Sequence, residues 1–281
     1  MKTVIIPVAG KGTRLLPLTK VTPKALLPVF DQPVIQFAVD EAVAAGAERL
    51  VIVDQSEQSA MRAYFENDMN EITALRVKSK HELADAMERS GAPKDLEVVF
   101  AIQPEALGLG HAILCAAEYI LDGPVGVILP DDVILGDPCL AEMDAAYVSG
   151  NMVAAMDVEL DDVSSYGIFD ISGLASLGTP IAAKGMVEKP AMEDAPSQLA
   201  AVGRYILTPE IFDVLKTIPK GAGGEFQLTD AISSMIADFG LTALKFSGVR
   251  FDCGNHAGLL AASNARYEIK IGEATFATAA E

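Results

Sequence analysis

The first 30 residues of this sequence contain no acidic side chain, although the chain as a whole is strongly acidic. It has 39 Asp and Glu against 21 Lys and Arg, which gives a formal net charge of −18 at pH 7. The same 30 residues hold the cations Lys2, Lys11, Arg14, Lys20 and Lys24. Because a solvated basic surface usually includes some acids, the missing carboxylates indicate a segment that binds an anion.

The sequence also lacks features of membrane or secreted proteins. No apolar run approaches the ~18–20 residues of a membrane span. The cysteines, Cys115, Cys139 and Cys253, are odd in number and widely spaced, without a metal-knuckle or redox motif. The apolar run 3–9 leads straight into the segment 10–14 with no A-x-A cleavage pattern. We therefore expect a cytoplasmic protein with reduced thiols and no membrane partner.

Further absences narrow the chemistry. The negative net charge argues against a polymeric nucleic acid as a partner, because that partner requires broad positive fields. His81, His111 and His256 form no cluster with zinc-ligand spacing. No Gly-x-Ser-x-Gly nucleophile elbow occurs in the sequence. We therefore expect neither a zinc site nor acyl-enzyme chemistry.

The first half of the chain alternates between strand and helix patterns. Buried-strand runs lie at 3–9, 49–55, 96–103 and 123–132, with helical patterns at 33–47, 59–67, 71–91 and 110–121. The helical stretch 71–91 is polar and charged, which is typical of an excursion outside a sheet. This alternation predicts a doubly wound, mainly parallel α/β sheet.

After Asn151 the pattern changes to short strands. They lie at 151–160, 166–172, 181–190, 199–207 and 241–254, with helical patterns at 223–240 and 257–271. This order predicts a mixed or antiparallel β extension to the first sheet. We expect a single domain, 1–281, with a first half at 1–150, a second half at 151–255 and a C-terminal helix at 256–281.

Residues Gly10–Arg14, with the sequence GKGTR, follow the first strand directly. A Gly-rich turn at this place can present backbone N–H groups to phosphates or to a base edge. Leu15 stands where a dinucleotide fingerprint needs its third glycine, and no P-loop string occurs. A lone G-x-G leaves a tight turn and a ligand loop as equal alternatives. The clustered cations, continuing to Lys20 and Lys24, favour a polyphosphate clamp.

Carboxylates end two of the apolar runs. Asp131 and Asp132 end the fourth strand run, and Asp252 ends an apolar stretch near the C-terminus. Ligands of open α/β sheets bind at the carboxyl ends of strands, and Mg²⁺ is commonly held there by one or two carboxylates with substrate phosphates. Adjacent strand residues point to opposite faces, so we expect one of the paired aspartates to face the site and the other a structural partner. A helix-cap role is the alternative.

Glu188 and Lys189 end a further strand run. The lysine could hold a phosphate and the glutamate could accept sugar hydroxyls, although an exposed ion pair is the simpler interpretation. Together with the basic loop and the strand-end carboxylates, the pair favours metal-assisted transfer between phosphates over hydride or acyl chemistry.

The motifs, taken together, resemble a known family. The stretch PVAGKGTRLLPLTKVTPKALLPV is similar to the signature of the sugar-1-phosphate nucleotidylyltransferases, and LGLGHAILCA, LPDDVI, YGIFDI, VEKP, VGRYIL, GGEFQLTDAI and FDCGN follow one another as in the bacterial UTP–glucose-1-phosphate uridylyltransferases. These blocks cover about residues 3–262. The resemblance implies a Rossmann-like, glycosyltransferase-A-like doubly wound mixed sheet with an added sugar-side β extension. Ala25 and Leu107 stand where this branch often has Glu and Lys.

The resemblance implies a role for each motif residue. The nucleotide-binding residues would be Ala9, Gly10, Gly12, Thr13, Arg14, Lys24, Gln103 and Gly108, with Ala9, Gly10 and Gln103 reading uracil. Sugar-phosphate binding would fall to Asp132, Tyr166, Gly167, Glu188 and Lys189. Asp131 and Asp252 would bind Mg²⁺, and the catalytic residues would be Arg14, Lys24, Asp131 and Lys189. Residues 1–150 would then form the nucleotide half and 151–255 the sugar-phosphate half.

The implied reaction joins UTP and glucose 1-phosphate to give UDP-glucose and pyrophosphate, in a homodimer or homotetramer. Two alternatives remain open at this point. One is a related transfer, such as thymidylyl transfer, and the other is a weakly active regulatory paralogue that binds UDP-glucose.

Overall fold

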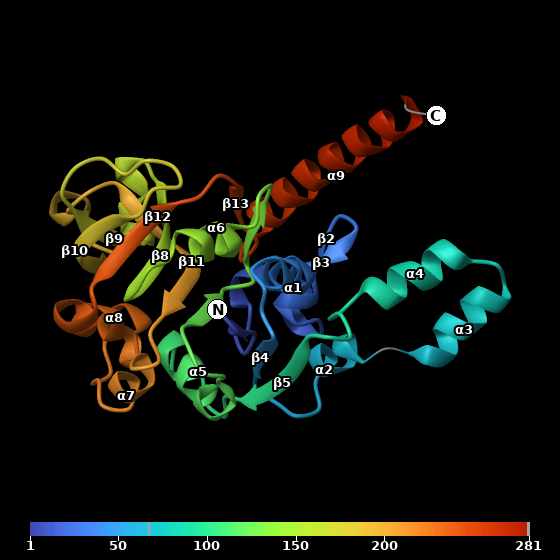
Figure 1. The fold of residues 1–281 in the computed structure, drawn as a ribbon, viewed down its shortest axis with the longest axis horizontal. Helices are drawn as coiled ribbons and strands as arrows, with labels where there is room; N and C mark the ends of the chain where they lie inside the picture. Colours follow the sequence, from blue (N-terminus) through green and yellow to red (C-terminus); the bar gives the residue numbers. More distant parts are fainter. Residues whose placement is uncertain (67, 280–281) are drawn as a thin grey trace.

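The computed structural model describes residues 1–66 and 68–279. The strands of its main sheet are β1 Thr3–Pro7, β4 Arg49–Asp54, β5 Glu97–Ile102, β6 Val125–Ile128, β8 Asn151–Asp157, β9 Gly167–Ile171, β10 Ile181–Glu188, β11 Leu199–Leu207 and β12 Leu241–Lys245. Their order is β5-β4-β1-β6-β11-β8-β12-β10-β9. One sheet thus runs through both halves of the chain (Figure 1).

The first four strands of this order are parallel. Of these, β4, β1 and β6 are buried on both faces, whereas the edge strand β5 is only half-buried. Ile5 and Val51 belong to the core on one face of the sheet, and Val4 and Leu50 belong to the core on the other. Strands covered on both faces appear in the sequence as continuous apolar runs, which is why the pattern predicted them. From β11 onward most pairings are antiparallel, and β12 pairs in parallel with β8.

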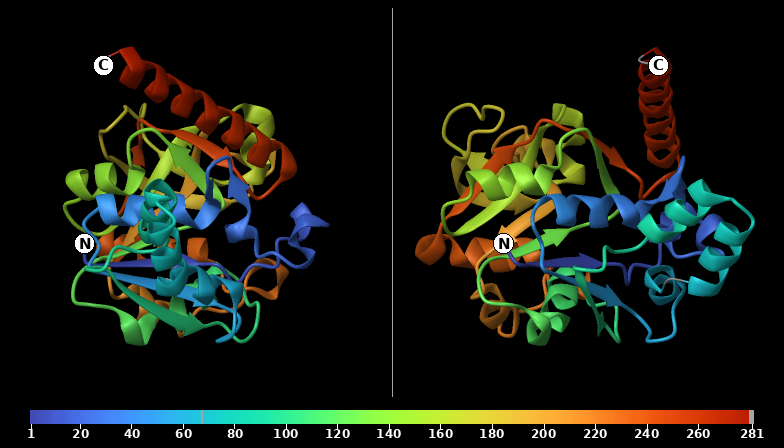
Figure 2. Two further views of the ribbon diagram at one scale, coloured as in Figure 1. Left: turned by 90° about the vertical axis from the view of Figure 1, so that its right-hand side faces the viewer. Right: turned by 45° about the vertical axis from the view of Figure 1, so that its right-hand side comes forward.

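Helices cover the sheet, and some extend away from it. They are α1 Val34–Ala44, α2 Ala60–Phe65, α3 Met69–Val77, α4 His81–Arg89, α5 Leu109–Cys115, α6 Cys139–Ala146, α7 Ile211–Leu215, α8 Leu228–Phe239 and α9 His256–Ala279. Figures 1 and 2 show α9 and the α3–α4 pair projecting from the body of the molecule. Within the described part of the chain, no helix is both long enough and apolar enough to cross a membrane.

Two small sheets complete the fold. One pairs β7, Asp132–Leu135, with β13, Val249–Asp252, and the other pairs β2, Pro28–Val29, with β3, Gln32–Pro33. The β7–β13 pair is antiparallel, and its register sets Asp252 opposite Asp132. This pairing brings together carboxylates that are far apart in the sequence.

The predicted mixed α/β architecture is confirmed, but some elements were not predicted. No helix or strand was predicted at β7, α6 or α7, which are short and have few residues in which a periodic pattern can show. The expected strand material at 241–254 is two strands, β12 and β13, in different sheets. Long-range pairing decides such a division, and local pattern does not contain it.

Candidate active site

The glycine-rich loop turns sharply at Gly12. Its φ of 62° lies in the left-handed region, and its carbonyl accepts a hydrogen bond from Thr19 Oγ1 at 2.8 Å. A Cβ added to Gly12 would lie 2.9 Å from Thr19 Cγ2, so a side chain does not fit here. The turn leads into the short 3₁₀ helix Thr13–Leu15, which buries Leu15 and leaves the Arg14 side chain 64% exposed. The loop therefore presents a cation to solvent at the end of β1.

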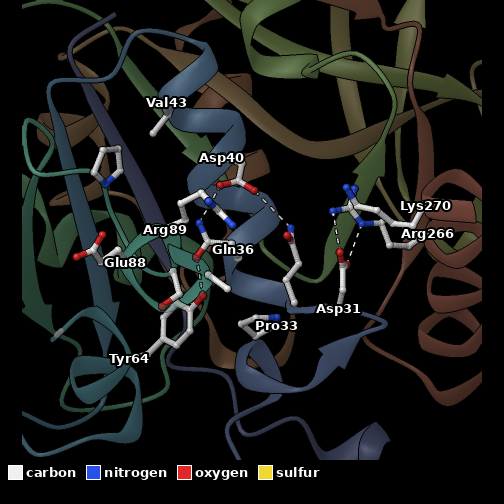
Figure 3. Close-up of a pocket in the computed structure, with 14 residues that line it drawn as sticks. Asp31, Pro33, Gln36, Asp40, Val43, Tyr64, Glu88, Arg89, Arg266 and Lys270 are labelled. Atoms are coloured by element: carbon white, nitrogen blue, oxygen red, sulfur yellow. Dashed lines mark hydrogen bonds and ion pairs between the residues drawn. The ribbon is translucent and has the colours of Figure 1, made fainter. Parts of the chain in front are cut away.

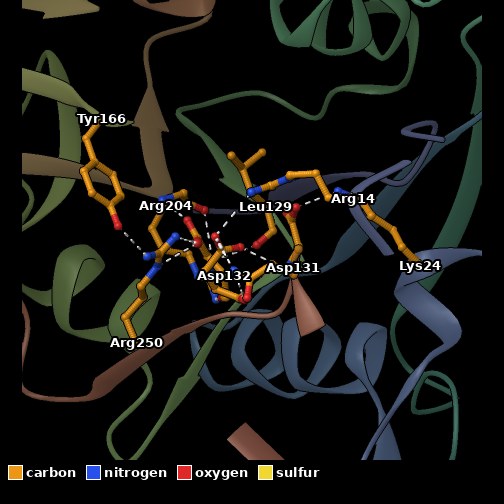
Figure 4. A network of polar contacts seen from close by, with 12 residues as sticks. Arg14, Lys24, Leu129, Asp131, Asp132, Tyr166, Arg204 and Arg250 are labelled. Atoms are coloured by element: carbon orange, nitrogen blue, oxygen red, sulfur yellow. Dashed lines mark hydrogen bonds and ion pairs between the residues drawn. The ribbon is translucent and has the colours of Figure 1, made fainter. Parts of the chain in front are cut away.

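Each of two loop cations contacts one of the two carboxylates predicted to bind metal. Lys24 Nζ lies 2.6 Å from Asp131 Oδ2, and Arg14 Nη1 lies 3.5 Å from Asp252 Oδ2. Figure 4 shows Arg14 and Lys24 on one side of the turn that carries Asp131 and Asp132. The structure thus brings together residues from three distant segments that the sequence analysis had selected.

The two carboxylates converge at Gly254. A Cβ added to this glycine would lie 2.8 Å from Asp252 Oδ1, 3.2 Å from Asp131 Oδ2 and 2.6 Å from Arg14 Nη2. Carboxylate oxygens are hard ligands of the type that Mg²⁺ prefers, and two of them suit an ion that completes its shell with phosphate oxygens and water. The described residues contain no group of three or more His, Cys, Asp or Glu that could hold a metal by themselves. The residues present therefore fit a Mg²⁺ ion that is shared with a phosphate ligand.

Asp131 and Asp132 lie in opposite electrostatic surroundings. Burial raises the pKa of Asp131, but the Lys24 ammonium and the more distant Arg14 charge outweigh it and hold that pKa below the usual value. Burial raises the pKa of Asp132 above its usual value, against the opposing charge of Arg250. Asp131 is therefore kept ionised and available to a cation.

Asp132 is held by protein groups on both carboxylate oxygens. Arg250 Nε donates to Oδ1 at 2.7 Å and Arg250 Nη2 donates to the same oxygen, while the Gly203 backbone N–H donates to Oδ2 at 2.9 Å. The expectation that one aspartate faces the site and the other a structural partner agrees with this arrangement. Neither aspartate caps a helix, because Asp132 is the first residue of β7 and Asp131 comes directly before it.

A buried ion pair supports the turn that carries Asp131 and Asp132. Arg204 is 1% exposed and forms a bidentate pair with Glu41 of α1, at 2.8 Å in its shorter arm. The same guanidinium donates to the carbonyls of Leu129, at 3.0 Å, and Asp132, at 2.7 Å. These two carbonyls flank Asp131. Arg204 was not among the predicted site residues, because a charged residue inside a strand run gives no sign of which groups it will contact after folding.

Four of the predicted sugar-side residues lie together where β9 begins and β10 ends, and the fifth, Asp132, lies on β7. Glu188 Oε2 accepts a hydrogen bond from Thr229 Oγ1 at 3.0 Å, and a Cβ added to Gly167 would lie 3.3 Å from the same oxygen. Lys189 Nζ lies 3.2 Å from Glu188 Oε1, with the lysine side chain 61% exposed. The Tyr166 carbonyl accepts the Lys189 N–H at 2.9 Å. The ion pair considered as the simpler interpretation is therefore present, and the lysine is accessible to an anion.

The predicted base-side residues lie beyond the carboxyl ends of β1 and β5. Gln103 is 4% exposed, and its Nε2 lies 3.1 Å from both the Gly108 carbonyl and His111 Nδ1. Gln55, which the sequence analysis missed, donates from Nε2 to the Ala9 carbonyl at 2.6 Å. The first contacts fix the Gln103 amide beyond β5, and the contact of Gln55 fixes the Ala9 backbone beyond β1. This arrangement is suited to reading the edge of a planar ring.

The GGEFQLTDAI segment closes over the loop 107–110. Phe226 N–H donates to the Leu107 carbonyl at 2.8 Å, and Gly110 N–H donates to the Phe226 carbonyl at 2.9 Å. Gly108 has a φ of 94°, and a Cβ added there would lie 2.7 Å from Glu225 Cβ. The GGEFQLTDAI motif, which had no predicted role in the site, therefore shapes the loop beside Gln103.

A separate cavity of about 770 Å³ lies between α1, α4 and α9. Figure 3 shows Gln36 at its floor, where the amide bonds Asp40, Tyr64 and the Gly91 backbone. An ion pair between Arg266 and Asp31, 2.9 Å long, lies at one side. None of the predicted site residues lines this cavity, so it is distinct from the candidate active site.

The chain is similar to known nucleotidyl transferases over most of its length. A family model described as nucleotidyl transferase matches residues 3–268. The UTP–glucose-1-phosphate uridylyltransferase of Escherichia coli strain K12 is 39% identical over 269 residues, which cover 93% of this chain and 89% of that protein.

Solved structures agree with the sequence relatives. A UTP-bound UGPase from Acinetobacter baumannii has a TM-score of 0.87 at 34% identity, over 95% of this chain and 93% of that one. A UDP-glucose pyrophosphorylase complexed with UDP-glucose has a TM-score of 0.81 at 38% identity, over 95% and 99% of the two chains.

Proposed function

We propose that this chain, which belongs to the nucleotidyl transferase family and within it to the bacterial UTP–glucose-1-phosphate uridylyltransferases, transfers the uridylyl group of UTP to glucose 1-phosphate. The products are UDP-glucose and pyrophosphate. The observation that carries the proposal is the meeting of Arg14 and Lys24 with Asp131 and Asp252 around Gly254. Two cations and two carboxylates at one point suit a triphosphate bound together with a divalent metal.

The basic loop acts as the triphosphate clamp. Gly10, Gly12 and Thr13 supply backbone N–H groups, and Arg14 and Lys24 supply the charge. A carboxylate in this segment would repel the nucleotide, which explains its absence from an otherwise acidic protein. Arg14 pairs with Asp252 and Lys24 pairs with Asp131, so nucleotide binding would exchange protein carboxylates for phosphates around these two cations. Arg14 then stabilises the charge of the departing pyrophosphate.

Asp131 and Asp252 are the residues that would hold Mg²⁺. When bound, the ion supplies charge neutralisation at the phosphates. The low pKa of Asp131 keeps its carboxylate available to a cation. Two carboxylates beside a triphosphate repel it without a cation, so we expect the metal and the nucleotide to bind together.

The sugar phosphate binds on the β9–β10 side. Lys189 holds its phosphate, while Tyr166, Gly167 and Glu188 contact the glucose ring. Thr229 fixes one oxygen of Glu188, which leaves the other to exchange Lys189 for a sugar hydroxyl. Asp132 acts on this side through Arg250, since both its oxygens already have protein partners.

Uracil is read by Gln103 and by the backbone of Ala9 and Gly10, with Gly108 against the base. Residues 1–150 then form the nucleotide half and 151–255 the sugar-phosphate half of one domain. The expected C-terminal helix, 256–281, completes it, and residues 280 and 281 of that range lie outside the described part of the chain. We further propose a Rossmann-like, glycosyltransferase-A-like description of the sheet and a homodimeric or homotetrameric assembly, which light scattering would test.

The reaction requires positioning more than covalent catalysis. The phosphate oxygen of glucose 1-phosphate attacks the α-phosphorus of UTP in line and expels pyrophosphate. The nucleophile is already an anion, so no general base is needed. Arg14, Lys24 and Lys189 align the two anions and offset their repulsion, which are effects that can supply most of the acceleration.

The test is pyrophosphate release from a panel of nucleoside triphosphates and sugar 1-phosphates with Mg²⁺. We expect UTP with glucose 1-phosphate to give the highest kcat/KM. A preference for thymidine triphosphate would support the thymidylyl alternative. Binding of UDP-glucose without any pyrophosphate release would support the regulatory alternative.

A further inference from the structure

Arg250 connects the sugar side of the site to the metal side. Its Nη1 donates to the Tyr166 hydroxyl at 3.1 Å, and the guanidinium carbon lies 5.5 Å from the centre of the Tyr166 ring. Its Nε and Nη2 donate to the Asp132 carboxylate. Figure 4 shows the guanidinium between the tyrosine and the turn that carries Asp131.

The position of Arg250 on β13 extends this connection to the second metal-binding carboxylate. Arg250 and Asp252 are two residues apart on one strand, so their side chains leave the same face. The side chain of Arg250 is 14% exposed and that of Asp132 is 12% exposed, which shields their bond from water. A movement of Arg250 would therefore affect Asp132, which is next to Asp131, and also Asp252 on the same strand.

The sugar end of the connection is also fixed. Tyr166 accepts the Lys189 N–H through its carbonyl, and Lys189 has a φ of 48°, a conformation that few non-glycine residues adopt. Glu188, the residue before Lys189, ends β10. An unbroken series of contacts thus runs from Lys189 through Tyr166 and Arg250 to the turn at Asp131.

We propose that Arg250 is a positioning residue that couples glucose 1-phosphate binding to metal binding at Asp131 and Asp252. This inference rests on the proposed function. When the sugar phosphate fixes Tyr166, Arg250 holds Asp132 and thereby the adjacent Asp131 in the metal-binding arrangement. Coupling between two sites is reciprocal, so each ligand tightens the other by the same factor.

The experiment measures Mn²⁺ affinity by electron paramagnetic resonance. The protein carries a UTP analogue whose α–β bridging oxygen is a methylene group, so that no turnover occurs, and is titrated with and without glucose 1-phosphate. In the wild type we expect glucose 1-phosphate to tighten Mn²⁺ binding at least about fivefold. In Tyr166→Phe, which loses only the hydroxyl, we expect the factor to fall to less than about twofold.

The variant Arg250→Lys keeps the positive charge but removes the connection between Asp132 and Tyr166. A lysine can still pair with Asp132, but it cannot also bond Tyr166 and stack on its ring. We expect the same loss of coupling, with Mn²⁺ affinity in the absence of sugar phosphate changed by less than about threefold. Because both changes break one connection, the double variant should be no worse than either single variant. Tyr147→Phe, which removes a hydroxyl bond to the Gly150 carbonyl, is the matched control and should keep the wild-type factor.

Different outcomes separate the two proposals. A wild type that releases pyrophosphate and shows the coupling, while both variants keep it, overturns the role of Arg250 alone. If Tyr166→Phe weakens glucose 1-phosphate equally with and without metal, the tyrosine only contacts the sugar, and the coupling role is again overturned. If the wild-type protein releases no pyrophosphate, that result contradicts the proposed function itself.

Discussion

Gly254→Ala is the change that most directly probes the meeting of charges in the site. An alanine Cβ would lie 2.6 Å from Arg14 Nη2, 2.8 Å from Asp252 Oδ1 and 3.2 Å from Asp131 Oδ2. Separations under about 3.0 Å force a movement. The exposed Arg14 side chain moves easily, but Asp252 Oδ1 is bonded to the Gly254 N–H at 2.9 Å and has less freedom.

The displacement needed is a few tenths of an ångström to about 1 Å. Misplacing reacting groups by about 1 Å can cost about 10²-fold in rate. We therefore expect kcat/KM for pyrophosphate release to fall about 10- to 100-fold, with a larger Mg²⁺ concentration required for half-maximal rate. The backbone of Gly254 does not lie in the left-handed region, so we expect little change in the folding midpoint.

Gly185→Ala in β10 is the matched control. No atom lies within 4 Å of its added Cβ, and its φ is also outside the left-handed region. The assay is initial-rate kinetics over a Mg²⁺ series, with thermal unfolding of each variant. A Gly254→Ala protein with wild-type kcat/KM and metal dependence would refute the convergence of Arg14 and the two carboxylates on one functional site.

Further outcomes are expected from the same geometry. Lys189→Ala should lower kcat/KM for glucose 1-phosphate by at least about tenfold, since a charge-assisted bond contributes ~1.5–3 kcal/mol, and titration calorimetry should show unchanged UTP binding; the assignment is wrong if UTP binding is what weakens. ATP and GTP should each be at least about tenfold poorer than UTP in steady-state kinetics, because the wrong base leaves buried polar groups unpaired. Asp131→Asn and Asp252→Asn should each cut turnover severely, with the double variant little worse, and EDTA should abolish activity that Mg²⁺ restores; full turnover in EDTA would exclude the metal site. Arg204→Met should reduce the free energy of unfolding by about 3–5 kcal/mol in urea titrations, because it strands the Glu41 charge, and adding Glu41→Leu should recover part of that loss.

The sequence by itself determined the parts of this protein that depend on local chemistry. A tight turn in the Gly-rich segment after β1 could be predicted, because glycine adopts the left-handed backbone that Gly12 shows and that other residues rarely adopt. The buried parallel strands could be predicted because burial on both faces requires continuous apolar runs. The different surroundings of Asp131 and Asp132 followed from the alternation of side chains along a strand.

Only the tertiary structure decided which distant groups meet. The antiparallel pairing of β7 with β13 sets Asp252 opposite Asp132, and a four-residue strand carries no pattern that names its partner. Arg204 and Arg250 are ordinary strand residues in the sequence, and their guanidinium groups acquire a role only where Glu41, Tyr166 and Asp132 surround them. A charge is compensated by whatever folding places within about 3 Å of it, and that proximity belongs to the packed chain rather than to its residue order.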